Sequence, residues 1–148
     1  MSEGDILLDV NVPMYAFGQA HSYKESCVWV MNEITEGRLA VAIDTEIIQE
    51  VLHRYGALRR LELAVTLAKG LIGLSSRIYP VALADMQLAI DLFQRFANQG
   101  KKARDLVHIA VMQNNGIGQI ISTDEHFDHI EGVTRLDPRR LFQQAHTQ

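Results

Sequence analysis

The chain has 148 residues, of which 47% are hydrophobic and 22% charged, a balance typical of one soluble globular domain with a sizeable core. No apolar run approaches the roughly 20 residues that a membrane-spanning helix needs, so we expect no membrane association. The net charge of −4 argues against a general polyanion-binding surface, although a metal site that held four carboxylates would leave the remaining surface neutral.

Two features bear on the cellular compartment. The start, Met1–Asp5, carries acids where a secretory signal would carry basic residues. Cys27 is the single cysteine, so it forms no internal disulfide and is most simply a buried small residue in a reducing compartment. We therefore expect a cytoplasmic protein.

In the first half of the chain, short apolar runs alternate with amphipathic segments. Ile6–Leu8 predicts a buried strand, and Asn11 and Pro13 predict a loop after it. A second strand is predicted at Leu39–Ile43, where Thr45 is placed to cap the next helix. The predicted helices of this half are His21–Gly37, Thr45–Tyr55 and Leu58–Leu74.

The second half continues the same alternation. The predicted strands are Arg77–Val81, Gln119–Ile121 and, at an edge, Val133–Leu136. The predicted helices are Ala84–Ala97, Ala103–Asn115 and a closing turn at Pro138–Phe142. The polar tail at residues 143–148 is expected to be frayed.

Strands that alternate with helices imply βαβ units, which build a parallel sheet packed between helices. We therefore predict a single three-layer α/β domain over residues 1–148, with its core at about residues 6–136. The sequence contains no internal repeat, low-complexity segment or linker that would divide it.

Four acids are candidates for one site: Asp9, Glu50, Asp105 and Asp124. Asp9 follows the first predicted strand and Asp124 a later one, and parallel strands bring their carboxyl ends to the same edge of a sheet. These two carboxylates therefore lie close together if their strands are neighbours. Glu50 lies within a helix. Asp105 begins a helix that follows another helix, so the sequence does not fix its position.

Each acid also has an ordinary structural explanation. Asp9 suits a turn, Asp105 favours the dipole of its helix, and Asp124 is placed to cap a short helix at 125–128. Glu50 suits a helix surface, although its apolar neighbours favour partial burial. Both interpretations stay open for each acid taken alone.

Taken together, the four acids indicate a metal site. Clustered carboxylates repel and raise one another's pKa values unless a cation neutralises them. Mg²⁺ and Mn²⁺ prefer oxygen ligands and bind through a few carboxylates together with a substrate phosphate. Such a metal activates water and polarises a phosphoryl oxygen, so hydrolysis of a phosphodiester is the reaction that fits.

Four motifs occur in order over most of the chain, from about Ile6 to Leu136. They are Leu-Leu-Asp9-Val-Asn11, Glu-Ile-Ile-Gln-Glu50-Val-Leu, Arg-Asp105-Leu-Val-His-Ile-Ala and Ser-Thr123-Asp124-Glu-His-Phe127. This order resembles the PIN-domain ribonuclease family. The resemblance implies an α/β/α sandwich with a mainly parallel sheet and a Mg²⁺- or Mn²⁺-dependent endoribonuclease site.

The resemblance also implies roles for individual residues. The family's metal-binding acids would correspond to Asp9, Glu50, Asp105 and Asp124, and its supporting polar residues to Asn11 and Thr123. Glu46 competes for the glutamate role, but only Glu50 immediately precedes an apolar pair as the family pattern has it. Asp128 is an extra acid, which we interpret as capping or solvated rather than as a peripheral ligand.

In size the chain is similar to the VapC-type toxins of toxin–antitoxin pairs. That similarity implies an RNA substrate, a homodimer and a small antitoxin protein as partner. Basic residues gather at Arg59–Arg60, at Lys101–Lys102 with Arg104, and at Arg139–Arg140. Each of these spots is more ordinarily a solvated helix face than a nucleic-acid contact.

Other chemistries find less support. No His-x₃-His pair occurs and the single cysteine has no partner, which argues against zinc. His108 either faces the acid site or is a hydrogen-bonded core residue, and His126 and His129 are expected at the surface. No Gly-x-Ser-x-Gly elbow exists, and Gly116-Ile117-Gly118 precedes a strand rather than a helix, so it is no dinucleotide fingerprint.

Two alternatives to a ribonuclease remain open. One is a non-catalytic module of the same fold that binds RNA or a protein. The other is a Mg²⁺-dependent small-molecule phosphatase. It is weakened because Asp9-Val10-Asn11 lacks the second acid of the Asp-x-Asp pair that haloacid-dehalogenase-like phosphatases use.

Overall fold

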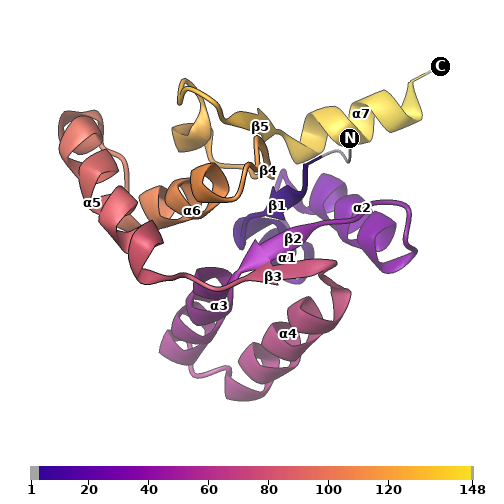
Figure 1. Ribbon diagram of the computed structural model, residues 1–148. Helices are drawn as coiled ribbons and strands as arrows, with labels where there is room; N and C mark the ends of the chain where they lie inside the picture. The colour runs from indigo at the N-terminus through magenta and orange to yellow at the C-terminus, as the bar shows by residue number, and fades with distance from the viewer. Residues whose placement is uncertain (1–3, 148) are drawn as a thin grey trace.

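The computed structural model describes residues 4–147, so part of the acidic start and Gln148 lie outside the described residues. At its centre is a five-stranded sheet in the order β3-β2-β1-β4-β5, with every neighbouring pair parallel (Figure 1). The strands are β1 (Ile6–Leu8), β2 (Ala42–Asp44), β3 (Arg77–Tyr79), β4 (Gln119–Ile121) and β5 (Thr134–Leu136). The helices are α1 (Asn11–Ala16), α2 (Lys24–Thr35), α3 (Thr45–Ala57), α4 (Leu61–Leu74), α5 (Leu83–Phe96), α6 (Ala103–Asn114) and α7 (Pro138–His146), with short 3₁₀ turns η1 (Ala97–Gln99) and η2 (Glu125–Phe127).

Helices cover both faces of the sheet, which confirms the predicted α/β/α sandwich. Successive strand residues point to opposite faces. Leu8 and Ile121 therefore pack in the core under α1–α4, whereas Leu7 and Ile120 pack in the core under α5 and α6. No helix within residues 4–147 is long and apolar enough to cross a membrane.

The pairing of β1 with β4 positions the site. Leu7 is in register with Ile120, and Leu8 with Ile121, so the two chains leave the sheet side by side. The backbone N–H of Asp9 donates to the carbonyl of Ile121 at 3.0 Å. The sequence left open whether the strands before Asp9 and Asp124 are neighbours, and the structure shows that they are.

The loop predicted after β1 was too long: only Asp9 and Val10 lie between β1 and α1, and Asn11 is already helical. Pro13 lies in the first turn of α1, where a missing N–H breaks no helical hydrogen bond and the fixed φ suits the helix. The cap of α3 was also misassigned by one residue. Asp44 accepts from the backbone N–H of Ile47 at 3.1 Å, and Thr45 is the first helical residue.

The C-terminal segment is more ordered than predicted. Instead of a turn to Phe142 and a frayed tail, α7 continues to His146. Its N-terminus is capped by Asp137, whose carboxylate accepts from the backbone N–H of Arg139 at 3.0 Å. Phe142 and His146 both contact the edge of the Trp29 ring on α2, and this contact fixes the last turn of α7.

Candidate metal centre

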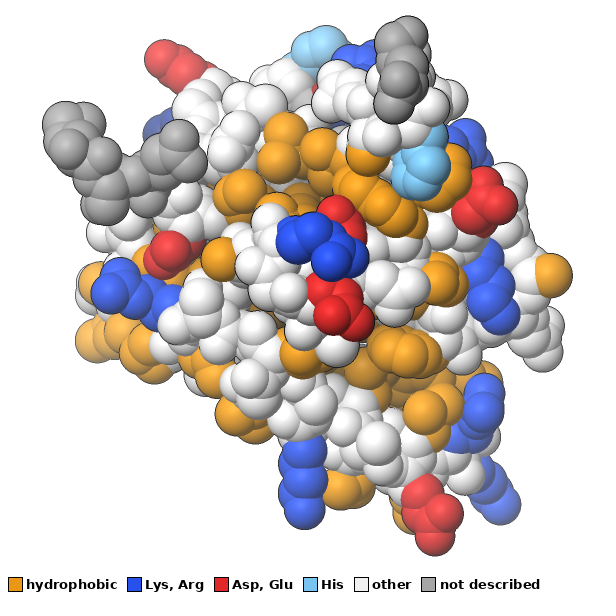
Figure 2. All heavy atoms as spheres, turned by 90° about the vertical axis from the view of Figure 1, so that its right-hand side faces the viewer, with side chains coloured by type: hydrophobic (Ala, Val, Ile, Leu, Met, Phe, Trp, Pro, Cys, Tyr) orange, Lys and Arg blue, Asp and Glu red, His pale blue; other side chains and the backbone are white. Residues whose placement is uncertain are grey.

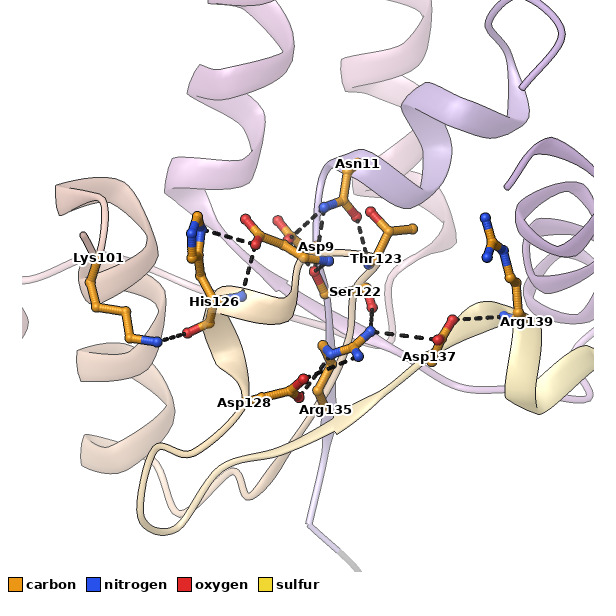
Figure 3. Close-up of polar contacts among 11 residues, drawn as sticks. Asp9, Asn11, Lys101, Ser122, Thr123, His126, Asp128, Arg135, Asp137 and Arg139 are labelled. Carbon is orange, nitrogen blue, oxygen red and sulfur yellow. Dashed lines mark hydrogen bonds and ion pairs between the residues drawn. The ribbon is translucent and has the colours of Figure 1, made fainter. Parts of the chain in front are cut away.

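Asp9 is held in a fixed orientation at the end of β1. It is 4% exposed, and its Oδ1 accepts from the backbone N–H of Val10 at 2.8 Å. Its Oδ2 accepts from Ser122 Oγ at 2.7 Å and from Asn11 Nδ2 at 3.1 Å (Figure 3). Strand β4 thus contributes Ser122 to the carboxylate that ends β1, and the first turn of α1 contributes Asn11.

Asp105 and Asp124 face each other across the same edge. Asp124 Oδ1 accepts from the backbone N–H of His126 at 2.9 Å and lies 3.0 Å from His126 Nδ1. Asp105, in the first turn of α6, is only 6% exposed. Among the described residues its Oδ2 finds no hydrogen-bond partner. A buried carboxylate oxygen without a partner is costly and indicates a site for a positive ligand.

Glu50 reaches the cluster from α3, where it is 4% exposed. Its Oε1 lies 2.7 Å from His108 Nε2, and its Oε2 lies 3.5 Å from Arg104 Nε and 3.7 Å from Arg54 Nη2. Ligand-type atoms of Asp9, Glu50 and His108 all lie within 4.8 Å of one another. The same holds for a second set, Asp105, Asp124 and His126.

Electrostatics join the two sets into one cluster. Burial raises the pKa of Asp105 to about 6, and the negative charges of Asp9 and Asp124 add to the shift. Burial also raises the pKa of Asp9, which the His108 charge and the Ser122 hydrogen bond partly offset. A bound cation would remove the repulsion between these acids, so the donor set fits a divalent metal that prefers oxygen.

His108 is fully buried and bridges two carboxylates. Its Nδ1 lies 2.6 Å from Asp44 Oδ2, and its Nε2 contacts Glu50. Burial alone would lower the pKa of His108. The Asp44 charge, the two hydrogen bonds and the Asp9 charge outweigh burial and raise it well above 6.5. The ring is therefore an imidazolium that donates through both nitrogens, and it has no lone pair left for a metal.

The structure brings the four predicted acids together, and it also shows residues that sequence reasoning missed. Glu46 lies outside both sets, whereas Glu50 lies inside one. The missed residues are Asp44, Ser122 and His126, of which His126 was expected only at the surface. The ring of His126 is 44% exposed, yet it lies against Asp124. One sign in the sequence indicated that His108 belongs to the site: it lies three residues after Asp105 on the same helix.

Comparison with known proteins identifies the family. Residues 6–133 match the family model described as PIN domain. The chain belongs to the PIN domain family. It is 34% identical over 131 residues to Ribonuclease VapC13 of Mycobacterium tuberculosis, an alignment that covers 88% of this chain and 98% of the relative.

Solved structures share the PIN fold at lower identity. VapC20 of Mycobacterium tuberculosis is described as a sarcin-ricin loop cleaving toxin, and it matches with a TM-score of 0.66 and 17% sequence identity. The match covers 81% of this chain and 90% of the VapC20 chain. A chain of a toxin–antitoxin complex from Klebsiella pneumoniae matches with a TM-score of 0.65 and 16% sequence identity. The match covers 90% of this chain and 98% of the other chain. At these identities the likeness concerns the fold.

A polar groove of about 740 Å³ opens beside the acids of this PIN domain. Its lining comes from α1, the start of α2, α3, the start of α6 and the segment after β4: Asn11, Tyr15, Tyr23, Arg54, Lys102, Thr123, Asp124, Glu125 and His126. Thr123 is held there because its backbone N–H donates to Asn11 Oδ1 at 3.3 Å. Acids, cations and aromatic rings therefore share one open surface.

Asp128 has a structural contact that we did not predict. It accepts from Arg135 Nε at 2.9 Å and from Nη2 at 3.2 Å, while Nη1 of the same guanidinium donates to the carbonyl of Ser122 at 3.1 Å (Figure 3). The Arg135 hydrogen bonds lower the pKa of Asp128. The pair ties β5 to the segment that carries Asp124. Asp128 is 35% exposed, so it is partly solvated as predicted, but its pairing with Arg135 was not predicted.

Proposed function

We propose that this PIN domain is a metal-dependent endoribonuclease that hydrolyses RNA phosphodiester bonds, and that it is the toxin of a type II toxin–antitoxin pair. The observation that carries the proposal is the convergence of buried Asp9, Glu50 and Asp105 with Asp124 at one sheet edge, beside an open groove. The relative VapC13 is named a ribonuclease, which supports the proposed cleavage of RNA.

Mg²⁺ or Mn²⁺ is the cation we propose for the site. Asp9, Glu50, Asp105 and Asp124 would hold it, since hard cations prefer carboxylate oxygen and the unpartnered Asp105 Oδ2 offers one. When bound, such a cation lowers the pKa of water and polarises a phosphoryl oxygen.

The residues of the chain supply positioning and charge. Ser122 and Asn11 fix the Asp9 carboxylate through hydrogen bonds to Oδ2. Lys102 and Arg54 line the groove and are placed to bind phosphate oxygens of the RNA backbone. The hydroxyl of Thr123, at the same wall, is suited to orient water or a phosphate. Together these groups hold the substrate in a fixed position next to the acids.

A non-catalytic binding module of the same fold is the main alternative. Such a module has no reason to keep Asp9 and Asp105 together, because buried carboxylates that repel each other lower the stability of the fold without a compensating cation. The raised pKa of Asp105 is a sign of this cost. The acid cluster therefore favours the enzyme.

Replacement of Asp9 by Asn tests the proposed function. We expect Asp9→Asn to abolish Mn²⁺-dependent cleavage of single-stranded RNA while the circular dichroism spectrum stays that of the folded protein. Asp91→Asn on the exposed side of α5 serves as the control and should cleave like the wild type. Full activity of Asp9→Asn would contradict the metal-site assignment.

The partners are part of the same proposal. We propose a homodimer and a small antitoxin protein, and a cytoplasmic location that suits the lone Cys27. Two exposed apolar surfaces support protein partners. One is on α5 (Leu83, Met86, Ile90, Phe93) and the other on α3 and α4 (Leu52, Leu58, Leu61, Val65, Ile72). Figure 2 shows hydrophobic side chains in the lower part of this face, at the height of α3 and α4, and also above its centre.

A further inference from the structure

Three aromatic rings lie together at the rim of the groove. The rings of Tyr15 and His21 are stacked with centroids 4.4 Å apart, and Tyr23 lies 5.7 Å from Tyr15 and 6.1 Å from His21 at small interplanar angles. We call Tyr15, His21 and Tyr23 the aromatic platform. Tyr15 and Tyr23 line the groove that also contains Asp124, and His21 is exposed. The metal cluster uses none of these rings.

The platform is held by Arg139 of α7 and by hydrogen bonds within its own segment between α1 and α2. The guanidinium of Arg139 on α7 lies 3.7 Å from the centroid of the Tyr23 ring, and its Nη2 donates to Ser22 Oγ at 2.7 Å. The backbone N–H of Tyr23 donates to His21 Nδ1 at 3.1 Å, which fixes the imidazole. Lys24 Nζ donates to the carbonyl of Gly18 at 2.7 Å. A surface that is ordered before binding loses little entropy when a ligand stacks on it.

The platform is joined to the acid cluster through α1. Asn11 and Tyr15 are four residues apart on this helix, so they share a face and lie about 6 Å apart along its axis. Asn11 donates to Asp9, whereas Tyr15 belongs to the platform. An RNA strand whose scissile phosphate lies beside the acid cluster therefore has a neighbouring nucleotide close to the platform.

We propose that the aromatic platform is a base-stacking subsite for single-stranded RNA, and that it binds the base of a nucleotide next to the bond that is cut. The proposal rests on the ribonuclease function proposed above. Grooves for single-stranded nucleic acid combine cations for the backbone with aromatic rings for the bases. Here Arg54 and Lys102 supply the cations and the platform supplies the rings. Stacking tolerates any base, so the platform positions the strand more than it reads the sequence.

The test combines a change in the protein with a change in the RNA. The probe is a short, end-labelled single-stranded RNA built around a bond that the wild-type protein cuts in a random-sequence pool. In a series of such RNAs, one base at a time is removed to leave an abasic ribose. We expect removal of the base at one position next to the cut to lower kcat/KM by about 5- to 150-fold, the range for the loss of one stacked base.

Tyr15→Leu, which removes the ring but keeps apolar bulk, should cause a similar loss on intact RNA and no further loss on that abasic RNA. Tyr15→Phe keeps the ring and should cleave like the wild type. The subsite would be overturned if Tyr15→Leu lowers kcat/KM on the abasic RNA by the same factor as on intact RNA. It would also be overturned if no abasic position lowers kcat/KM. Variants that cleave normally but no longer bind a protein partner would overturn it too, because the platform would then serve a protein.

Two further measurements distinguish failure of the stacking subsite from failure of the proposed ribonuclease function. His21→Ala alters an exposed side chain, so it provides the same comparison if Tyr15→Leu fails to fold. Cleavage that needs Mn²⁺ and Asp9 but ignores the platform would contradict the subsite alone. Absence of any Mn²⁺-dependent cleavage by the wild type would instead contradict the proposed function.

Discussion

His108 Nε2 lies 2.7 Å from Glu50 Oε1, while the opposite ring nitrogen lies 2.6 Å from Asp44 Oδ2. One buried imidazolium thus links the end of β2, helix α3 and helix α6. It neutralises charge that would otherwise be buried without a partner. We predict that His108→Ala lowers the free energy of unfolding by about 3–5 kcal/mol, the cost of leaving one side of a buried ion pair unpaired.

Urea unfolding followed by circular dichroism measures this effect. The matched control is His53→Ala, which alters an exposed histidine on α3 and should change the free energy of unfolding by no more than about 0.5 kcal/mol. A His108→Ala variant as stable as the control would show that the bridge does not hold these elements together.

Asp105 predicts an unusual dependence of stability on pH. Its pKa is raised from 3.8 to about 6 in the folded protein, so between these values the folded state binds more protons than the unfolded state. Stability therefore falls as the pH rises through this window. Asp105→Asn removes the charge. Without divalent metal, the free energy of unfolding of this variant minus that of the wild type should therefore be about 2 kcal/mol larger at pH 7.5 than at pH 4.5.

The measurement is urea unfolding of both proteins in chelator at the two pH values. Asp91→Asn, at an exposed position on α5, is the control and should show a difference from the wild type that does not depend on pH. A difference for Asp105→Asn that stays constant, or that decreases toward neutral pH, would contradict the electrostatic account of the cluster.

A change in the Arg135–Asp128 pair should lower the stability of the fold without changing its affinity for metal. Asp128→Asn weakens the contact between β5 and the segment after β4, so we expect a loss of about 1 kcal/mol in the free energy of unfolding. Calorimetric titration with Mn²⁺ should give the wild-type affinity, because Asp128 is already paired. A large loss of Mn²⁺ affinity would make Asp128 a ligand instead.

The proposed toxin role predicts an effect in cells. Expression of the wild-type protein alone should arrest bacterial growth, and co-expression of a small protein encoded next to it should restore growth. Asp9→Asn expressed to the same level should be harmless, because the arrest requires cleavage. Strong, harmless expression of active wild-type protein would count against the toxin role.

Much of the architecture could be predicted from local patterns. The runs Ile6–Leu8 and Gln119–Ile121 were identified as strands from apolar residues and flanking turns, but the sequence did not settle that these two strands are neighbours. Helix α1 could not be predicted in the same way. Pro13 is compatible with a loop and with a first helical turn, and only packing against α2 decides between them.

The acids of the site were identifiable, but their partners were not. Glu50 and Asp105 were named because of their positions in motifs, whereas Asp44 belongs to no such motif and was not recognised even as the cap of α3. Its contact with His108 spans 64 residues of sequence, and no local spacing signals it. The same holds for Arg139, whose place over the Tyr23 ring depends on how α7 packs on α2.

The proposed function requires a divalent cation at the edge where β1 and β4 end. The most direct measurement is the anomalous scattering of Mn²⁺ in crystals of the protein soaked with that ion. We predict one strong peak bound by carboxylate oxygens of Asp9, Asp105 and Asp124, with Asp105 Oδ2 among the ligands. The absence of a peak at these acids under conditions in which the protein cleaves RNA would contradict the assignment.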